Sequence, residues 1–179
     1  MNATIALFGF GFIARTFIML VTNILFRHHA QISLQGGFIC ITIPTNLKWS
    51  PGMHIFLRFA HIRPLESHPF TISSIPKLEA EGLSEMVFMI RPETGFTRVL
   101  AEVAATISPD RKFPVILDGP YGETGTNTLR SYDSVLLLAG GTGITFIAPI
   151  LADLVRAMKQ KDGPCKSVEM YWAVKSTGK

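Results

Sequence analysis

The chain has few charged residues, and neither sign is in large excess. Charged residues make up 17% of its 179 residues, and the formal net charge is +4. Its Lys and Arg residues form no cluster dense enough to predict a nucleic-acid groove. With 47% hydrophobic residues, the composition also excludes an intrinsically disordered chain. The length suits one folded domain, or one domain and part of another.

Cysteine is scarce, and internal repeats and low-complexity tracts are absent. The two cysteines, Cys40 and Cys165, lie far apart and make no CxxC pair. The sequence therefore predicts neither a metal site nor a disulfide. Cys40 falls in an apolar run and is interpreted as a small core residue.

Charge is almost missing from residues 3–26, where Arg15 is the one charged side chain. The length meets the roughly 20 apolar residues that a membrane span needs. Arg15 at mid-bilayer would cost about 2.5–3.5 kcal/mol, so we expect the span to end near it and residues 16–26 to continue as an interfacial helix. A signal peptide is less favoured because no basic stretch precedes the apolar run, and a buried soluble helix of this length would be unusual in so small a protein. The basic flank at residues 27–29 predicts a membrane-attached N-terminus with the remainder in the cytosol.

Short strand-like runs with glycine and proline between them begin at residue 31. Gly36-Gly37 predicts a hairpin between residues 31–35 and 38–43, which Pro44 is expected to end. A tight turn is expected over residues 118–122. Further strands are expected at residues 53–60, 86–91 and 113–117. This pattern predicts a small antiparallel barrel.

One helix is predicted within this strand-rich part, over residues 96–107. Its apolar residues recur at helical spacing, and Thr94 and Gly95 precede it. The free N–H groups at its N-terminus would suit an anion such as a pyrophosphate. A plain capped helix explains the same pattern.

The period changes after a polar linker at residues 125–131. Residues 135–139 form a wholly apolar run, as expected of a parallel strand covered on both faces. Gly140-Gly141-Thr142-Gly143 follows, then a helix over residues 144–159 and a strand over residues 167–174. Strand, glycine-rich turn and helix bring backbone N–H groups close to a dinucleotide phosphate.

The stretch His-Pro-Phe-Thr-Ile-Ser-Ser, residues 68–74, combines an imidazole, an aromatic ring and a hydroxyl. In an extended strand, His68 and Phe70 share one face and Thr71 points to the other. Pro69 holds His68 out of the helical region. A flat ring system could stack on Phe70, bond to Thr71 and have its phosphates reached by His68. An ordinary buried strand explains these residues when they are taken alone.

Four motifs then occur in a fixed order: RPLESHPFTISSIP at 63–76, GFT at 95–97, LDGPYG at 117–122 and LAGGTGIT at 138–145. In this combination the chain resembles the cytosolic part of ferric reductase transmembrane proteins of the fungal type. That family is related to NADPH oxidases and more distantly to ferredoxin–NADP reductases. The resemblance covers residues 6–174.

The resemblance implies an α+β part leading into an α/β part. It implies a ferredoxin–NADP reductase-like, FAD-binding β-barrel at residues 30–124 and an incomplete Rossmann-like, NADPH-binding domain at 132–179. Residues 1–29 would then be the end of a membrane helix.

It also implies residue roles. Thr71 is expected to be catalytic, bonding the redox-active nitrogen side of the flavin. Residues 95–97 would meet the FAD pyrophosphate, 119–122 the nicotinamide side and 140–145 the NADPH pyrophosphate, while Lys175 and Ser176 stand where a basic group for the ribose 2′-phosphate is common. The residues assigned to cofactor binding are His68, Pro69, Phe70, Thr71, Ser74, Gly95, Phe96, Thr97, Gly119, Pro120, Tyr121, Gly122, Gly140, Gly141, Thr142, Gly143, Thr145 and Lys175.

By the same resemblance, NADPH gives a hydride to FAD, and single electrons pass on through haem to ferric iron. The family's paired haem-binding histidines and the distal part of its NADPH domain are absent here. We therefore expect a fragment at both ends, with haem only in an upstream membrane domain. The histidines at positions 28, 29, 54 and 61 are interpreted as surface residues, not as haem ligands.

Two other functions remain open. A superoxide-producing NADPH oxidase shares His-Pro-Phe-Thr, although Arg63-Pro64-Leu65-Glu66 before it favours the reductase. A non-catalytic, membrane-anchored flavin-domain remnant is the alternative from a different class.

Overall fold

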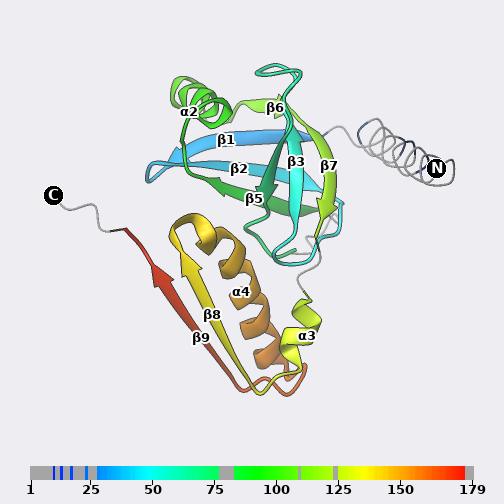
Figure 1. Ribbon diagram of the computed structural model, residues 1–179. Coiled ribbons are helices and arrows are strands. Elements are labelled where there is room, and N and C mark those ends of the chain that lie inside the picture. Colours follow the sequence, from blue (N-terminus) through cyan, green and yellow to red (C-terminus); the bar gives the residue numbers. More distant parts are fainter. Residues whose placement is uncertain are drawn as a thin grey trace, which may run out of the picture.

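The computed structural model has a strand-rich upper part, formed by the described residues from 28 to 122, and a smaller lower part, formed by residues 125–175 (Figure 1). The structure describes residues 28–76, 83–108, 110–122 and 125–175, together with Phe10, Ile13, Phe17 and Asn23. Those four single residues are helical. Arg15 and the rest of the predicted membrane segment lie outside the described residues.

The first sheet is antiparallel, with the strand order β5-β2-β1-β6. The β1–β2 hairpin is confirmed, and Gly36 and Gly37 turn it with φ of 57° and 81°, a conformation that favours glycine. Pro44 does not end β2 as expected. It pairs with Glu85 of β5 beyond the last β1 partner, Thr42, where a missing N–H is tolerated. The strands are β1 (His29–Gln35), β2 (Phe38–Thr45), β5 (Ser84–Ile90) and β6 (Lys112–Pro114).

The second sheet has the order β4-β3-β7 and comprises β3 (His54–Arg58), β4 (His68–Thr71) and β7 (Ile116–Tyr121). The predicted single strand at residues 113–117 is wrong, because β6 pairs in one sheet and β7 in the other. Val115 lies between them, 4% exposed, and its N–H donates to His28 O at 3.1 Å. The expected tight turn at residues 118–122 is also wrong, since most of it continues β7. Among the described residues, the strands of this part thus form two packed sheets that do not close into a barrel.

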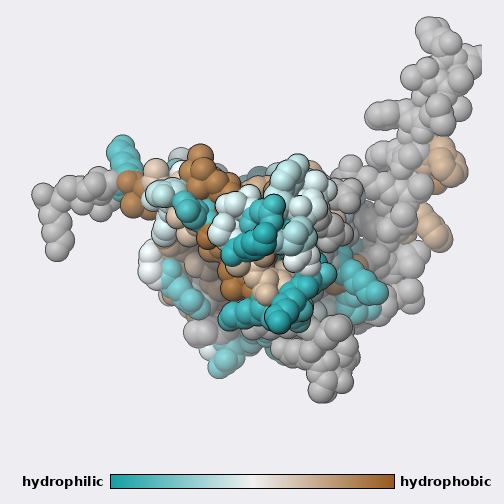
Figure 2. All heavy atoms as spheres, turned by 90° about the horizontal axis from the view of Figure 1, so that it is seen from below, coloured by the Kyte–Doolittle hydropathy of each residue, from teal (hydrophilic) through white to brown (hydrophobic). Residues whose placement is uncertain are grey.

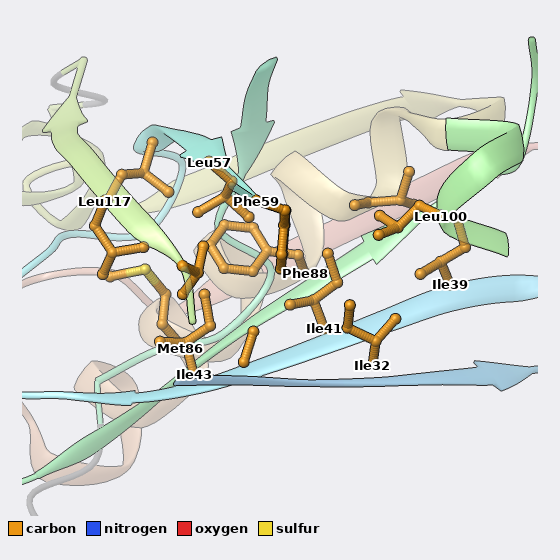
Figure 3. Packing of buried hydrophobic residues seen from close by; sticks show 14 of the residues in the cluster. Ile32, Ile39, Ile41, Ile43, Leu57, Phe59, Met86, Phe88, Leu100 and Leu117 are labelled. Carbon is orange, nitrogen blue, oxygen red and sulfur yellow. The ribbon is translucent and has the colours of Figure 1, made fainter. Parts of the chain in front are cut away.

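One hydrophobic core lies between these sheets and helix α2 (Phe96–Thr106) (Figure 3). The predicted helix is confirmed, and it buries Phe96 and Leu100 against the strands. Large side chains from both sheets are fully buried, among them Ile41, Leu57 and Phe88. Burying each such side chain contributes roughly 1.5–3 kcal/mol, so this core anchors the loops and strand ends around it.

The lower part holds a parallel strand pair with one helix packed against it. It consists of α3 (Thr126–Arg130), β8 (Ser134–Gly140), η1 (Gly141–Gly143), α4 (Ile144–Gln160) and β9 (Ser167–Ala173). The expected polar linker at residues 125–131 is corrected, because α3 forms there and Leu129 packs on the core of β8 and α4.

The apolar run of β8 is typical of a strand covered on both faces, and within the described residues one of its faces is covered. Val135, Leu137 and Ala139 are buried, whereas Leu136 and Leu138 are 58% and 67% exposed. In the described part of the chain, α4 covers a single face of the pair. Figure 2, a view from below, shows hydrophobic surface in brown beside hydrophilic side chains in teal.

Residues 141–160 are the one stretch of described helix long and apolar enough to cross a membrane. This helix nevertheless packs on β8 and carries Asp153, which is 1% exposed. Asp153 binds Arg130 at 2.7 Å and Arg156 at 2.8 Å. A paired internal carboxylate and a sheet on one side are typical of a core helix.

Asn23 ties the helical N-terminal residues to the second sheet. Its Nδ2 donates to Leu117 O at 2.8 Å, and Leu117 N–H donates to its Oδ1 at 2.9 Å. Leu117 lies in β7, which is an edge strand, so the amide satisfies backbone groups that β3 does not reach.

We predict that Asn23→Asp destabilises the fold by about 1–3 kcal/mol, because the carboxylate loses the donor and faces a carbonyl oxygen. Urea unfolding measures the change. Gln35→Ala, at the exposed end of β1, is the control and should stay within about 0.5 kcal/mol. Equal stability of both variants would contradict an anchoring role for Asn23.

Candidate functional site

The register of β4 against β3 sorts the side chains of the His-Pro-Phe-Thr motif. His68 and Phe70 pair with Leu57 and Ile55, which are fully buried, so this face of β4 turns towards the core. Thr71 pairs with His54 on the opposite face. The alternation is the one expected of a strand.

The imidazole of His68 is held on two sides. Its ring stacks on Phe96, with 4.4 Å between ring centroids and 15° between planes. Its Nε2 lies 3.0 Å from Glu66 Oε2, and Glu66 also lies 3.6 Å from Arg63 Nη1. The sequence indicated neither the stacking partner nor the role of Glu66, because both contacts are made only in the folded chain.

Phe96 itself is a core residue, 5% exposed, so only its backbone can serve an anion. The N-terminus of α2 remains open. Gly95 has φ of 62°, and a Cβ added there would meet no described atom within 4 Å. Thr97 Oγ1 accepts the N–H of Glu93 at 3.0 Å and bonds Thr94 O at 3.3 Å. Residues 95–97 thus offer an accessible backbone at a helix N-terminus, which fits a pyrophosphate.

A cleft of about 250 Å³ joins the two parts of the molecule. The upper part contributes Phe70 and Thr71 of β4, and the lower part contributes Thr142 and Thr145. Two motifs that lie far apart in the sequence therefore face one cavity. The complete lining is Pro69, Phe70, Thr71, Met89, Ile90, Arg91, Glu93, Thr142 and Thr145. Met89, Ile90, Arg91 and Glu93 were not predicted as site residues. The sequence signal that could have identified them is their position just before Gly95.

The glycine-rich turn after β8 leaves its backbone uncovered. An added Cβ at Gly140, Gly141 or Gly143 would meet no described atom within 4 Å. Thr145 Oγ1 donates to Thr142 O at 2.9 Å, and Trp172 Nε1 donates to Gly141 O at 2.9 Å. These bonds fix the turn at the start of α4, and its open backbone fits a dinucleotide phosphate.

Residues 119–122 do not line the cleft. Tyr121 pairs with His54, which pairs in turn with Thr71, so the three lie in a row across the second sheet. The Tyr121 hydroxyl donates to Asp118 Oδ1, and its ring meets Phe56 edge-on at 6.0 Å. The peptide bond from Gly119 to Pro120 is cis. Gly122 lies beside this row, where an added Cβ would be 3.4 Å from His54 Nδ1.

Ser74 and Lys175 lie outside the cleft. Ser74 Oγ donates to Glu85 O and accepts the N–H of Val87, both at 3.0 Å, so its hydroxyl ties the segment after β4 to β5. Lys175 is exposed just after β9. Gly140 and Ala173 are paired at the carboxyl ends of the parallel strands β8 and β9. Lys175 therefore lies at the same end of the strand pair as η1. Ser176 lies outside the described residues.

Comparison with known families gives two consecutive matches. An FAD-binding domain family matches residues 32–125, and the ferric reductase NAD binding domain family matches residues 132–179. The probable cell surface ferric reductase kap2 of Aspergillus oryzae is 31% identical over 97% of this chain. The ferric/cupric reductase transmembrane component 7 of Saccharomyces cerevisiae is 34% identical over 75% of the chain. The chain spans 24% and 19% of the lengths of these two relatives.

Solved structures share the fold at low identity. The Amycolatopsis cytochrome P450 reductase GcoB aligns with a TM-score of 0.58 and 13% identity, over 85% of this chain and 44% of its own. Phthalate dioxygenase reductase aligns with a TM-score of 0.54 and 12% identity, over 84% and 44%. Ferredoxin-NADP+ reductase from Plasmodium falciparum gives 0.51 and 11%, over 84% and 57%. The predicted fold class is thereby confirmed.

Gly119 is the position in this region where a side chain is least tolerated. Its φ is 134°, and an added Cβ would lie 3.1 Å from both Ile55 Cγ1 and Tyr121 Cδ2. We predict that Gly119→Ala destabilises the fold by roughly 1–3 kcal/mol, as measured by urea unfolding. Gly140→Ala is the matched control, since its Cβ meets open space, and a loss of the same size there would contradict the steric explanation.

Proposed function

This chain belongs to the ferric reductase family, and we propose that it accepts electrons from NADPH on FAD and passes them on towards haem and ferric iron. The cleft that Thr71 of β4 shares with Thr142 and Thr145 after β8 carries this proposal. A flavin ring and a nicotinamide ring must meet for hydride transfer, and this cavity is bounded by one motif for each. When bound, FAD supplies the change from hydride to single-electron chemistry.

The upper part is proposed to bind FAD. Pro69 and Phe70 border the cleft beside Thr71, and Thr71 offers a hydroxyl for the redox-active nitrogen side of the ring. His68 is held by Phe96 and Glu66, which places a hydrogen-bonding group on the route to the α2 N-terminus. The backbone of Gly95, Phe96 and Thr97 is proposed to bind the pyrophosphate.

The lower part is proposed to bind NADPH. The turn from Gly140 to Gly143 offers uncovered N–H groups at the start of a 17-residue helix, where the helix dipole favours an anion. Thr142 and Thr145 would orient the dinucleotide towards the cleft, and Lys175 stands at the same edge for a 2′-phosphate. We place the domain boundaries at residues 1–29, 30–124 and 132–179.

Residues 119–122 are proposed to border the nicotinamide side. Tyr121 and Thr71 flank His54 on the two neighbouring strands. At ordinary strand spacing, the backbones of Tyr121 and Thr71 are therefore about 10 Å apart. The Tyr121 side chain is fixed by Asp118 and Phe56. A ligand extending beyond Thr71 along this face would reach it.

Attachment to a membrane is proposed for the N-terminal residues, with the nucleotide-binding part facing the cytoplasm. Phe10, Ile13 and Phe17 are 73%, 67% and 66% exposed, and their spacing of three and four residues puts them on one helix face. Relatives include proteins named transmembrane components. Haem is proposed to lie in a membrane domain that precedes these residues in the relatives.

We predict that the double variant His68→Ala/Thr71→Ala loses FAD, because the ring and the phosphates each lose a polar partner. Losing one hydrogen bond to a charged group corresponds to about a 10–100-fold weaker affinity. Flavin absorbance after desalting the full chain measures retention. His61→Ala, a histidine outside the cleft, is the control. Unchanged FAD retention in the double variant would rule out this assignment, and a wild-type chain that never takes up FAD would favour the non-catalytic module.

The preferred electron acceptor, ferric chelate or oxygen, distinguishes a ferric reductase from a superoxide-producing NADPH oxidase. With FAD bound and NADPH supplied, we expect the full chain to reduce a ferric chelate faster than it produces superoxide from oxygen. Parallel assays of ferrous iron and superoxide measure the two rates. The Thr71→Val variant, which keeps the shape and removes the hydroxyl, should slow both. Faster superoxide production would favour the NADPH oxidase reading.

A further inference from the structure

A second cavity, of about 340 Å³, lies away from the cleft. Leu83, just before β5, lines it, whereas the cleft takes its β5 residues from the other end, Met89 and Ile90. Seven residues of strand span about 20 Å, so the two cavities are separate. The lining residues are His28, His29, Gln31, Pro44, Thr45, Asn46, Leu83 and Lys112.

The lining of this cavity is basic and rich in hydrogen-bond donors. Lys112 of β6 pairs with Gln31 of β1, and His29 lies two residues before Gln31 on the same strand face. Within the described part of the chain, Lys112 makes no ion pair of 4 Å or less. Glu85 is the neighbouring acid across the sheet, opposite Pro44, but it does not line the cavity. Among the described residues, the Lys112 ammonium group that lines this cavity therefore has no ion-pair partner.

His28 is the buried polar residue of the wall, contrary to the interpretation of it as a surface histidine. It is 6% exposed. Its ring hydrogen-bonds to the backbone of Pro44, and Nε2 is left without a partner. Burial lowers the pKa of His28, a backbone bond to Pro44 opposes this, and the neighbouring His29 adds to the lowering. Buried polar atoms are normally paired, and the cavity that His28 lines has room for a hydrogen-bonding group.

We propose that this cavity binds a phosphate group, carried either by a small phosphorylated molecule or by the head group of an anionic lipid. Phosphate oxygens accept charge-assisted hydrogen bonds from Lys112 and from His29, and the amides of Gln31 and Asn46 add neutral donors. A protonated phosphate oxygen can donate to the free His28 Nε2. None of the residues in the flavin and nucleotide cleft takes part, so the proposal stands apart from the electron-transfer function.

The place of the cavity explains why a lipid is one of the two sources. It lies at the start of β1, beside His28 and His29. Phe10, Ile13 and Phe17, which precede His28 by 11 to 18 residues, expose apolar side chains. If those side chains enter a bilayer, head groups come close to Lys112 and His29.

The site is tested by titrating the FAD-saturated full chain with inorganic phosphate. Binding is monitored by the NMR signals of the Lys112 and Gln31 amides and of the His28 ring. Bound FAD occupies the proposed α2 anion site and keeps it from contributing. Lys112→Gln should weaken the affinity about tenfold or more, the size expected for one charged hydrogen bond. Lys159→Gln, an exposed lysine of α4, removes the same charge elsewhere and should leave the affinity unchanged. His28→Phe is a second variant that fills the space and removes the unpartnered nitrogen.

Vesicles of phosphatidylcholine with and without phosphatidic acid distinguish the sources. Extra binding to phosphatidic acid that Lys112→Gln abolishes and Lys159→Gln retains identifies a lipid head group. Local NMR shifts with inorganic phosphate, without that extra vesicle binding, identify a small phosphorylated ligand. The proposal is overturned if neither probe acts at the cavity, or if Lys159→Gln loses as much as Lys112→Gln, which would show general electrostatic attraction.

Discussion

The register of β4 against β3 decides which side chains of the His-Pro-Phe-Thr motif reach a ligand. Pairing Phe70 with Ile55 and His68 with Leu57 turns both rings towards the core face, and it leaves Thr71 beside His54 on the other. A shift of one residue would exchange the two faces. The buried Ile55 and Leu57 make such a shift costly, so hydrophobic burial in the upper part also fixes the polar geometry of the cleft.

The cleft also depends on how the two parts are held together. Arg156 of α4 donates to Pro76 O at 3.4 Å, two residues after Ser74 bonds to β5. The same arginine binds the buried Asp153, which also holds Arg130. A carboxylate inside the lower part thus orients the side chain that reaches the upper part. Interfaces of this polar kind permit relative motion of domains, which suits a cleft that has to admit a dinucleotide.

The two cavities divide the chemistry of the upper part between the ends of β5. At one end, Met89 and Ile90 border the cleft. At the other, Lys112, His29 and His28 gather around a pocket of mixed polarity. Asn23 bonds to the backbone of Leu117 in β7. The proposed electron transfer and the proposed phosphate binding would therefore use different ends of β5.

Several elements were determined by the sequence alone, because their signals are local. Gly36-Gly37 determined the first hairpin, the spacing from Phe96 to Ile107 determined α2, and strand, glycines and helix in succession identified the nucleotide-binding turn. The motif order identified the family. Only the tertiary structure decided that residues 112–121 divide between two sheets, that His28 is buried with an unpartnered nitrogen, and that Thr71 meets Thr142 in one cleft. These features rest on pairings between residues far apart in the chain, which no local period or propensity records.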